Sequence, residues 1–135
     1  MSGSKPSIRK EFRNKHPELL HRDSMSTALC KHLKLEINSR NYSNIGSFVC
    51  RKHEPSLVSL LEAFSGKVSF PKVNGSSLAF FKVASVQELL PGYKGILEPA
   101  DSGKPTQFGT NDIILVPGIC FDEWGARLGS GLGFY

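Results

Sequence analysis

The sequence lacks the features that mark membrane-inserted, secreted and disulfide-stabilised proteins. No stretch approaches the ~18 consecutive apolar residues that span a bilayer, and Met1–Pro6 contains no hydrophobic secretory segment. The three cysteines, Cys30, Cys50 and Cys120, are far apart and odd in number. This pattern argues against a disulfide framework and for a reducing compartment. We therefore expect a cytoplasmic protein with no membrane partner.

Short catalytic and metal-binding motifs are also missing. There is no C-x-x-C, and the histidines His16, His21, His32 and His53 have no metal-ligand spacing with the cysteines. The G-x-S-x-G elbow of serine hydrolases does not occur either. Cys50 and His53 are close in sequence, but a cysteine at the end of a buried strand is more often a packing residue. Neither a zinc site nor a thiol or serine nucleophile is expected.

Positive charge is concentrated in the first third of the chain. The net charge is +5, yet residues 1–52 alone contain eleven Lys and Arg against four Asp and Glu. Such a segment indicates an anionic partner, which is a nucleic acid, a nucleotide or an acidic metabolite. The alternative is a solvated helix face with no partner. Nucleic acid ranks last, because no recognition motif such as a ribonucleoprotein signature is present.

Apolar residues at helical spacing predict three helices in the first half of the chain. Ile8 and Phe12 are four residues apart, and Met25, Leu29 and Leu33 repeat at the same interval. Serines provide N-caps for the second helix, and an acidic turn opens the third. The helices are expected over residues 7–15, from residue 24 or 26 onward, and after residues 54–56.

Short runs that are apolar on both faces predict four buried strands. They are expected over Ile45–Cys50, Val68–Phe70, Leu78–Val83 and Ile113–Val116, with Pro71 ending the second. Val86–Leu90 is expected to form one helical turn. Apolar strands separated by helices are typical of a mostly parallel sheet with covered faces. The predicted fold is a single α/β domain, Rossmann-like and three-layered.

The glycine-rich segment from Gly125 to Tyr135 is the most unusual part of the sequence. Alternating glycines can present successive backbone N–H groups to phosphate oxygens, and Arg127 can add a bidentate positive charge. The spacing fits neither the dinucleotide fingerprint nor the P-loop, so a flexible tail remains the alternative. Glu54 follows the first predicted strand, either as a ligand-facing carboxylate or as an ordinary first-turn acid. Glu98 precedes Pro99 in a loop, where turn chemistry alone can explain it.

Five segments, taken in order, resemble the 5-formyltetrahydrofolate cyclo-ligase family. They are Lys5–Arg9 (K-x-x-hydrophobic-R), Phe48–Pro55 (a strand followed by E-P), Phe70–Val73, Gly95–Pro99 (G-I-x-E-P) and Asp112–Tyr135. The last is similar to D-x-x-x-x-P-G-x-x-F-D-x-x-G-x-R-L-G-x-G-x-G-Y-Y, which is long and specific. The resemblance covers nearly the whole chain.

This resemblance implies an ATP- and Mg²⁺-dependent ring closure of 5-formyltetrahydrofolate to 5,10-methenyltetrahydrofolate, with release of ADP and phosphate. The implied ATP-binding residues are Lys5, Arg9, Arg127, Leu128, Gly129, Ser130, Gly131, Leu132, Gly133, Phe134 and Tyr135. Val49, Glu54 and Phe134 are implied to bind the folate, and Arg127 to act in catalysis. The basic N-terminal segment would then meet ATP or the glutamyl tail of a polyglutamylated folate.

The chain departs from the family pattern at its end. The family motif continues with an Asp that binds Mg²⁺, whereas this sequence stops at Tyr135, so no metal ligand is assigned here. Residues 1–135 are accordingly expected to form one domain whose C-terminal part is missing, folding marginally or self-associating, while the complete protein is expected to be a monomer. The alternative function is a folate- or nucleotide-binding relative, or a fragment, without catalysis.

Overall fold

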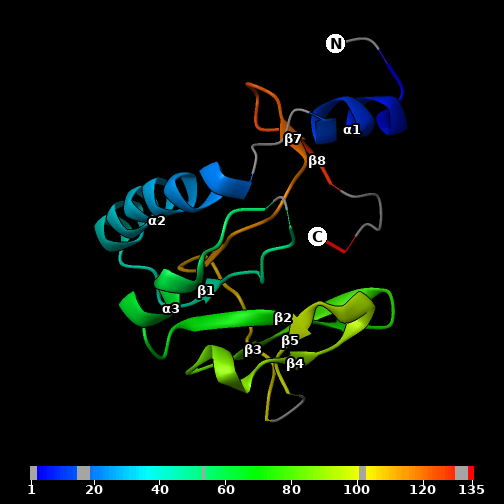
Figure 1. The fold of residues 1–135 in the computed structure, drawn as a ribbon. Helices are drawn as coiled ribbons and strands as arrows, with labels where there is room; N and C mark the ends of the chain where they lie inside the picture. Colours follow the sequence, from blue (N-terminus) through cyan, green and yellow to red (C-terminus); the bar gives the residue numbers. More distant parts are fainter. Residues whose placement is uncertain (1–2, 15–18, 53, 101–102, 130–133) are drawn as a thin grey trace.

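A central sheet of four strands organises the fold (Figure 1). The computed structural model describes residues 3–14, 19–52, 54–100, 103–129 and 134–135. The strands are β1 (Ile45–Gly46), β2 (Val68–Asn74), β3 (Ser77–Lys82) and β6 (Ile113–Ile114), in the order β3-β2-β1-β6. β1 pairs in parallel with both β2 and β6, and β3 pairs antiparallel with β2. The predicted fold class, mixed α/β with a mostly parallel sheet, is confirmed.

Three α-helices within the described residues accompany the sheet. They are α1 (Lys5–Asn14), α2 (Leu19–Arg40) and α3 (Val58–Ala63). Within the described residues, none is long and apolar enough to span a membrane. The predicted start of α2 at Ser24 or Ser26 is wrong. The Ser24 hydroxyl donates back to the His21 carbonyl at 3.0 Å, and Ser26 accepts from the Ser56 N–H at 3.0 Å. Both serines therefore lie inside the helix instead of capping it.

The apolar stripe predicted for α2 is wrong at Met25 and Leu29, whereas its third member, Leu33, packs against both apolar clusters of the protein. Met25 and Leu29 are 53% and 38% exposed, whereas Cys30 and Ile37 are buried. The buried residues face two apolar clusters built on β1, β2 and α3. Those clusters contain Ile37, Ile45, Leu61, Val68, Phe70, Val83 and Leu89 in one, and Cys30, Phe48, Leu57 and Leu60 in the other. The position of α2 against the sheet therefore determines which of its faces is buried, and the four-residue apolar repeat alone does not.

Two of the predicted strand boundaries are also wrong. β2 continues through Pro71, which pairs with Phe80 of β3, and the hairpin turns at Gly75 with a left-handed φ of 65°. Proline is tolerated in β2 because Pro71 lies beyond the residues of β2 that pair with β1, so the ladder does not need its N–H. β1 is shorter than predicted, although the Ser47 N–H still donates to the Ser69 carbonyl at 2.9 Å. The helical turn predicted over Val86–Leu90 is confirmed as η1 (Val86–Glu88).

In the part of the chain that the structure describes, two small antiparallel ribbons lie outside the central sheet, and the sequence predicts neither. The first consists of β4 (Leu90–Pro91), the turn η2 (Tyr93–Gly95) and β5 (Leu97–Glu98). The second pairs β7 (Cys120–Phe121) with β8 (Arg127–Leu128) and lies beside α1 (Figure 1). Because the strands are two residues long, no alternating pattern marks them in the sequence.

Asp112 ties the starts of β1 and β6 together. Its Oδ1 accepts from the backbone N–H of Asn44 at 2.8 Å and from the Asn44 amide at 3.1 Å. Its Oδ2 accepts from the Gly109 N–H at 2.7 Å. The Gly109 hydrogen bond, aided by those from Asn44, lowers the pKa of Asp112 below its ordinary value of 3.8. A lowered pKa means that the ionised carboxylate stabilises the fold.

An Asp112→Asn variant is expected to be less stable than the wild type near neutral pH, because an NH₂ group replaces one accepting oxygen. The wild-type advantage is complete above pH 3.8 and is lost as the pH falls through the lowered pKa of Asp112. Urea unfolding of both proteins at neutral and acidic pH measures this. A stability difference that is the same at every pH would contradict the role assigned to the ionised carboxylate.

Candidate functional site

A cavity of about 1020 Å³ lies between α1, the loop after β1 and the two ribbons. Every predicted site residue that the structure describes lines it, although these positions come from distant parts of the chain. These residues are Lys5, Arg9, Val49, Glu54, Arg127, Leu128, Gly129, Phe134 and Tyr135. The predicted residues Ser130–Gly133 lie outside the described residues. The fold thus brings the residues expected for ATP and those expected for folate into one cavity.

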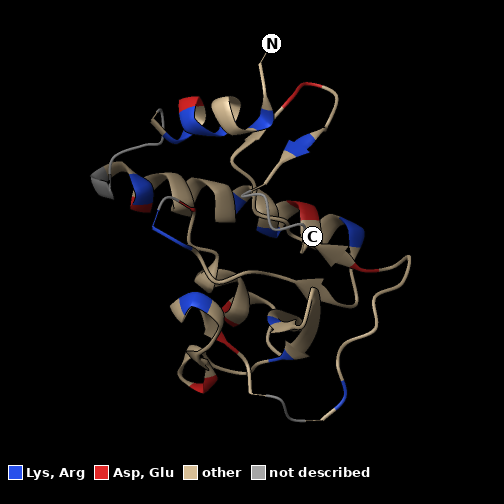
Figure 2. Cartoon of the chain, turned by 90° about the vertical axis from the view of Figure 1, so that its right-hand side faces the viewer, with Lys and Arg blue, Asp and Glu red and all other residues tan. Residues whose placement is uncertain are grey.

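The lining of this cavity is strongly positive. Among the described residues, seven Lys and Arg line it, against two glutamates. The cationic residues are Lys5, Arg9, Arg13, Arg51, Lys52, Lys94 and Arg127, and the acidic ones are Glu54 and Glu98. Blue segments on α1 and on the β7–β8 ribbon mark part of this charge in Figure 2. Such an excess in a concave site attracts anions such as phosphates and carboxylates.

Arg9 joins α1 to the end of β8. Its Nε donates to the carbonyl of Gly129 at 2.8 Å, across 120 positions of sequence. The side chain is partly buried, and α1 contains no buried residue of its own. This hydrogen bond therefore fixes the basic helix beside the start of the glycine-rich segment. The two terminal nitrogens of the guanidinium make no hydrogen bond to a described residue and can bind a ligand in the cavity.

Arg127 is held in place by its neighbours on the second ribbon. Its Nε donates to the Pro117 carbonyl at 2.7 Å, and its guanidinium lies 5.7 Å from the centre of the Tyr135 ring. The turn before it is closed by Asp122, whose Oδ1 accepts the N–H groups of two later residues. Gly125 takes the left-handed φ of 88° that this turn requires. The sequence folds locally to present one oriented positive charge.

Glu54 is oriented by two arginines from different elements. Its Oε1 accepts from the Arg51 N–H at 2.8 Å, which leaves Oε2 without a hydrogen bond to a described residue. The Nε of Arg22 donates to the Glu54 carbonyl at 2.9 Å, and Nη2 lies 2.7 Å from the Cys50 sulfur. Arg22 thus ties α2 to the loop. Sequence reasoning missed this residue, because it lies 32 positions before Glu54 with no local motif to identify it.

Tyr135 lies where the two predicted groups of residues meet. Loss of solvent around its phenol and the negative charge of Glu54 raise the pKa of Tyr135 to about 12, against a smaller opposing effect of Arg127. The phenol is therefore protonated at physiological pH and can donate a hydrogen bond. Tyr135 is expected to belong with the ATP residues, yet its electrostatic neighbour is the expected folate residue Glu54.

The first ribbon forms another wall of the cavity. Tyr93 packs edge-on against Phe134, with ring centres 5.7 Å apart, and Glu98 lies buried behind it. From the sequence, Tyr93 has no predicted site role, and turn chemistry alone can explain Glu98. The G-I-x-E-P resemblance of Gly95–Pro99 is the signal that marks Glu98. Tyr93 has only its aromatic type, which is not specific without the fold.

The described part of the chain holds no group of three His, Cys, Asp or Glu residues that could bind a metal ion. Glu54 and Glu98 line the cavity, but each accepts a hydrogen bond from a backbone N–H. The cationic side chains suit phosphate groups, and the described carboxylates do not form a magnesium site.

Comparison with known proteins gives a consistent result. A family model described as the 5-formyltetrahydrofolate cyclo-ligase family matches residues 1–135. The chain is 29% identical to the Aquifex aeolicus 5,10-methenyltetrahydrofolate synthetase, with a TM-score of 0.82 over 97% of this chain and 69% of that one. A 5,10-methenyltetrahydrofolate synthetase from Mycoplasma pneumoniae shares the fold at 17% identity, with a TM-score of 0.73 over 98% and 75% of the two chains. The comparison with curated protein sequences finds no match.

Replacing Arg9 by Met is expected to loosen α1, because the hydrogen bond from Nε to Gly129 is lost while the aliphatic stem is kept. A hydrogen bond from a charged donor contributes on the order of 1–2 kcal/mol when it is only partly buried. Amide hydrogen exchange of α1 should accelerate accordingly. Arg13→Met is the matched control on the same helix. Unchanged exchange in Arg9→Met, or equal acceleration in both variants, would contradict the tether.

Proposed function

We propose that this chain, which belongs to the 5-formyltetrahydrofolate cyclo-ligase family, closes 5-formyltetrahydrofolate to 5,10-methenyltetrahydrofolate at the expense of ATP. The observation that supports this most is the convergence, on one cavity, of the residues expected for each substrate. A volume of about 1020 Å³ is at the upper end for small-molecule sites, which suits two substrates better than one.

The proposed chemistry asks the protein for positioning and charge stabilisation. The formyl oxygen attacks the γ-phosphorus and ADP leaves. The neighbouring amine then attacks the formyl carbon and loses its proton to solvent, and phosphate departs with the former formyl oxygen. No side chain has to act as a nucleophile in this sequence. Bringing the two reactants into contact and neutralising phosphate charge are therefore the main catalytic demands. The positive lining of the cavity meets the second demand.

We assign Lys5, Arg9 and Arg127 to the binding of the ATP phosphates. Lys5 and Arg9 are on the same helix, and Arg127 enters from β8. Because the Nε groups of Arg9 and Arg127 are engaged by backbone carbonyls, their terminal nitrogens have fixed directions. Fixed guanidinium groups stabilise developing phosphate charge without reorganising in the transition state. Arg127 is proposed as the catalytic residue among the three.

The folate side is assigned to Val49, Glu54 and Phe134. Glu54 offers its Oε2 to N–H groups of the pterin, while Oε1 keeps the carboxylate oriented through Arg51. Val49 and Phe134 supply apolar contact, and the neutral Tyr135 phenol can donate where the two substrates meet. Mg²⁺ is proposed only as a companion of the ATP phosphates. No step is assigned to it through the described residues of this chain.

The direct test is an absorbance assay for methenyltetrahydrofolate with the whole chain. Product should form only when 5-formyltetrahydrofolate, ATP and Mg²⁺ are all present. Arg127→Ala should lower kcat/KM by about a hundredfold or more, the usual cost of removing a preorganised transition-state donor. Binding of both substrates without turnover would favour the non-catalytic relative. Absence of both binding and turnover would remove the proposal.

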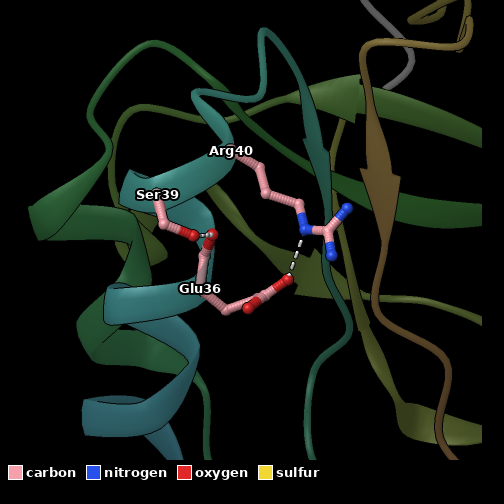
Figure 3. Close-up of polar contacts among 3 residues, drawn as sticks. All are labelled: Glu36, Ser39 and Arg40. Atoms are coloured by element: carbon pink, nitrogen blue, oxygen red, sulfur yellow. Dashed lines mark hydrogen bonds and ion pairs between the residues drawn. The ribbon is translucent and has the colours of Figure 1, made fainter.

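Arg40→Ala is the matched control for charge removal. Arg40 ends α2 away from the cavity lining and pairs with Glu36 at 2.7 Å on the surface (Figure 3). The pair is a helical i,i+4 contact that stabilises the protein by only about 0.3–0.5 kcal/mol. Its loss should leave kcat/KM unchanged. A comparable loss of activity in both arginine variants would show a nonspecific effect of charge.

Glu54→Gln is expected to show that Glu54 belongs with the residues assigned to folate and not with those assigned to ATP. The amide keeps the acceptor for the Arg51 N–H but weakens charge-assisted hydrogen bonds to the pterin. The KM for 5-formyltetrahydrofolate should rise by about tenfold, with a much smaller effect on the KM for ATP. Steady-state kinetics with each substrate varied in turn measure this. A rise confined to the KM for ATP would reverse the assignment.

A further inference from the structure

Glu98 is a buried carboxylate with a structural partner on the central sheet. The residue is only 8% exposed and ends β5. Its Oε2 accepts the N–H of Val73 at 2.8 Å, and its Oε1 lies 3.9 Å from the Lys72 ammonium. Val73 lies beyond the residues of β2 that pair with β1. The carboxylate therefore takes the place that a strand partner would otherwise have there.

Gly92 provides the space that the Glu98 side chain occupies. A Cβ atom at this position would lie 1.8 Å from Oε1 and 2.3 Å from Cδ of Glu98. The φ of Gly92 is −130°, so the packed carboxylate, and not a left-handed backbone, excludes a side chain. The Gly92 N–H also donates to the Ile96 carbonyl at 2.9 Å, which closes the ribbon around Glu98.

The same ribbon lines the cavity through the residues of its turn. Tyr93, Ile96 and Leu97 are part of the lining, and Tyr93 contacts Phe134 edge-on at 5.7 Å. Lys94 adopts a left-handed φ of 53°, which is unfavourable for a residue with a Cβ. Such a turn needs an anchor outside itself to keep one conformation. Within the described residues, Glu98 provides the side-chain hydrogen bond from this ribbon to β2.

We propose that Glu98 is a positioning residue: by fixing the 90–98 ribbon to β2, it sets Tyr93 against Phe134 and so shapes the folate side of the cavity. The proposal has two halves. The kinetic half, that Glu98 affects the KM for 5-formyltetrahydrofolate, rests on the proposed function. The structural half, that Glu98 fixes the ribbon to β2, rests on the Val73 hydrogen bond and on the Gly92 contact. Glu98 acts through Tyr93 and needs no contact with either substrate.

The structural half is tested by amide exchange at Val73. Glu98→Ala should accelerate that exchange by about tenfold or more, because the acceptor is lost. Glu98→Gln should restore most of the protection, since its amide oxygen can still accept. Gly92→Ala should mimic Glu98→Ala by displacing the carboxylate. Glu88→Ala is the matched control. Exposed Glu88 lies in η1, just before the ribbon, and accepts hydrogen bonds from two backbone N–H groups, but it does not line the cavity.

The kinetic half is tested with the same variants. Glu98→Ala and Gly92→Ala should each raise the KM for 5-formyltetrahydrofolate by about fivefold, with smaller effects on kcat and on the KM for ATP. The double variant should be no worse than Glu98→Ala alone, because the clash disappears with the carboxylate. Glu98→Gln should restore the KM, and Glu88→Ala should leave it unchanged.

The two halves fail in different ways. A released Val73 amide with an unchanged KM, additive effects in the double variant, or an equal effect of Glu88→Ala would each overturn the positioning role. If the wild type neither binds nor converts 5-formyltetrahydrofolate, the proposed function fails instead. The anchor is then decided by exchange at Val73 and by trypsin cleavage after exposed Lys94. Faster cleavage in Glu98→Ala but not in Glu98→Gln supports it, and equal cleavage overturns it.

Discussion

The hydrogen bond from Arg9 to the Gly129 carbonyl is the contact on which the site depends. It joins the first helix to the last ribbon and thereby closes the cavity between them. α1 contributes no fully buried residue, although Ile8 and Phe12 are half-buried, so this hydrogen bond adds a directed contact to a helix with little core packing. The Arg9 guanidinium thus both helps to assemble the site and offers its remaining nitrogens to it. Arg127 is anchored in the same way, because its Nε donates a hydrogen bond to the Pro117 carbonyl.

Tyr135 has an arginine and a carboxylate as electrostatic neighbours. Guanidinium groups suit phosphates, while a carboxylate such as that of Glu54 suits N–H groups. The Arg127 guanidinium lies 5.7 Å from the centre of the Tyr135 ring, and Glu54 contributes to the raised pKa of its phenol. One neutral donor therefore lies near both kinds of charge. This arrangement fits a reaction in which a folate oxygen must reach a phosphorus atom.

The sequence predicts the fold class and nine of the residues that line the cavity, but not how they are held. Apolar runs such as Val68–Phe70 identify buried strands, and the arginine and glycines after Asp112 mark the site through a specific pattern. The sequence does not predict which face of a helix packs against the rest of the protein. α2 buries Cys30 and not Met25, because the position of the helix against the sheet determines its buried face. Arg22 and Glu98 act through partners that are distant in sequence. The G-I-x-E-P segment marks Glu98, but no local spacing identifies the partner of either residue.

The central claim is that one cavity brings the formyl oxygen into direct contact with the γ-phosphate. Turnover of 5-formyltetrahydrofolate labelled with ¹⁸O in the formyl group tests this most directly. The account predicts that the label appears in the inorganic phosphate, because the formyl oxygen leaves with it. Methenyltetrahydrofolate formed together with unlabelled phosphate would contradict the account, since the two substrates would then react without meeting.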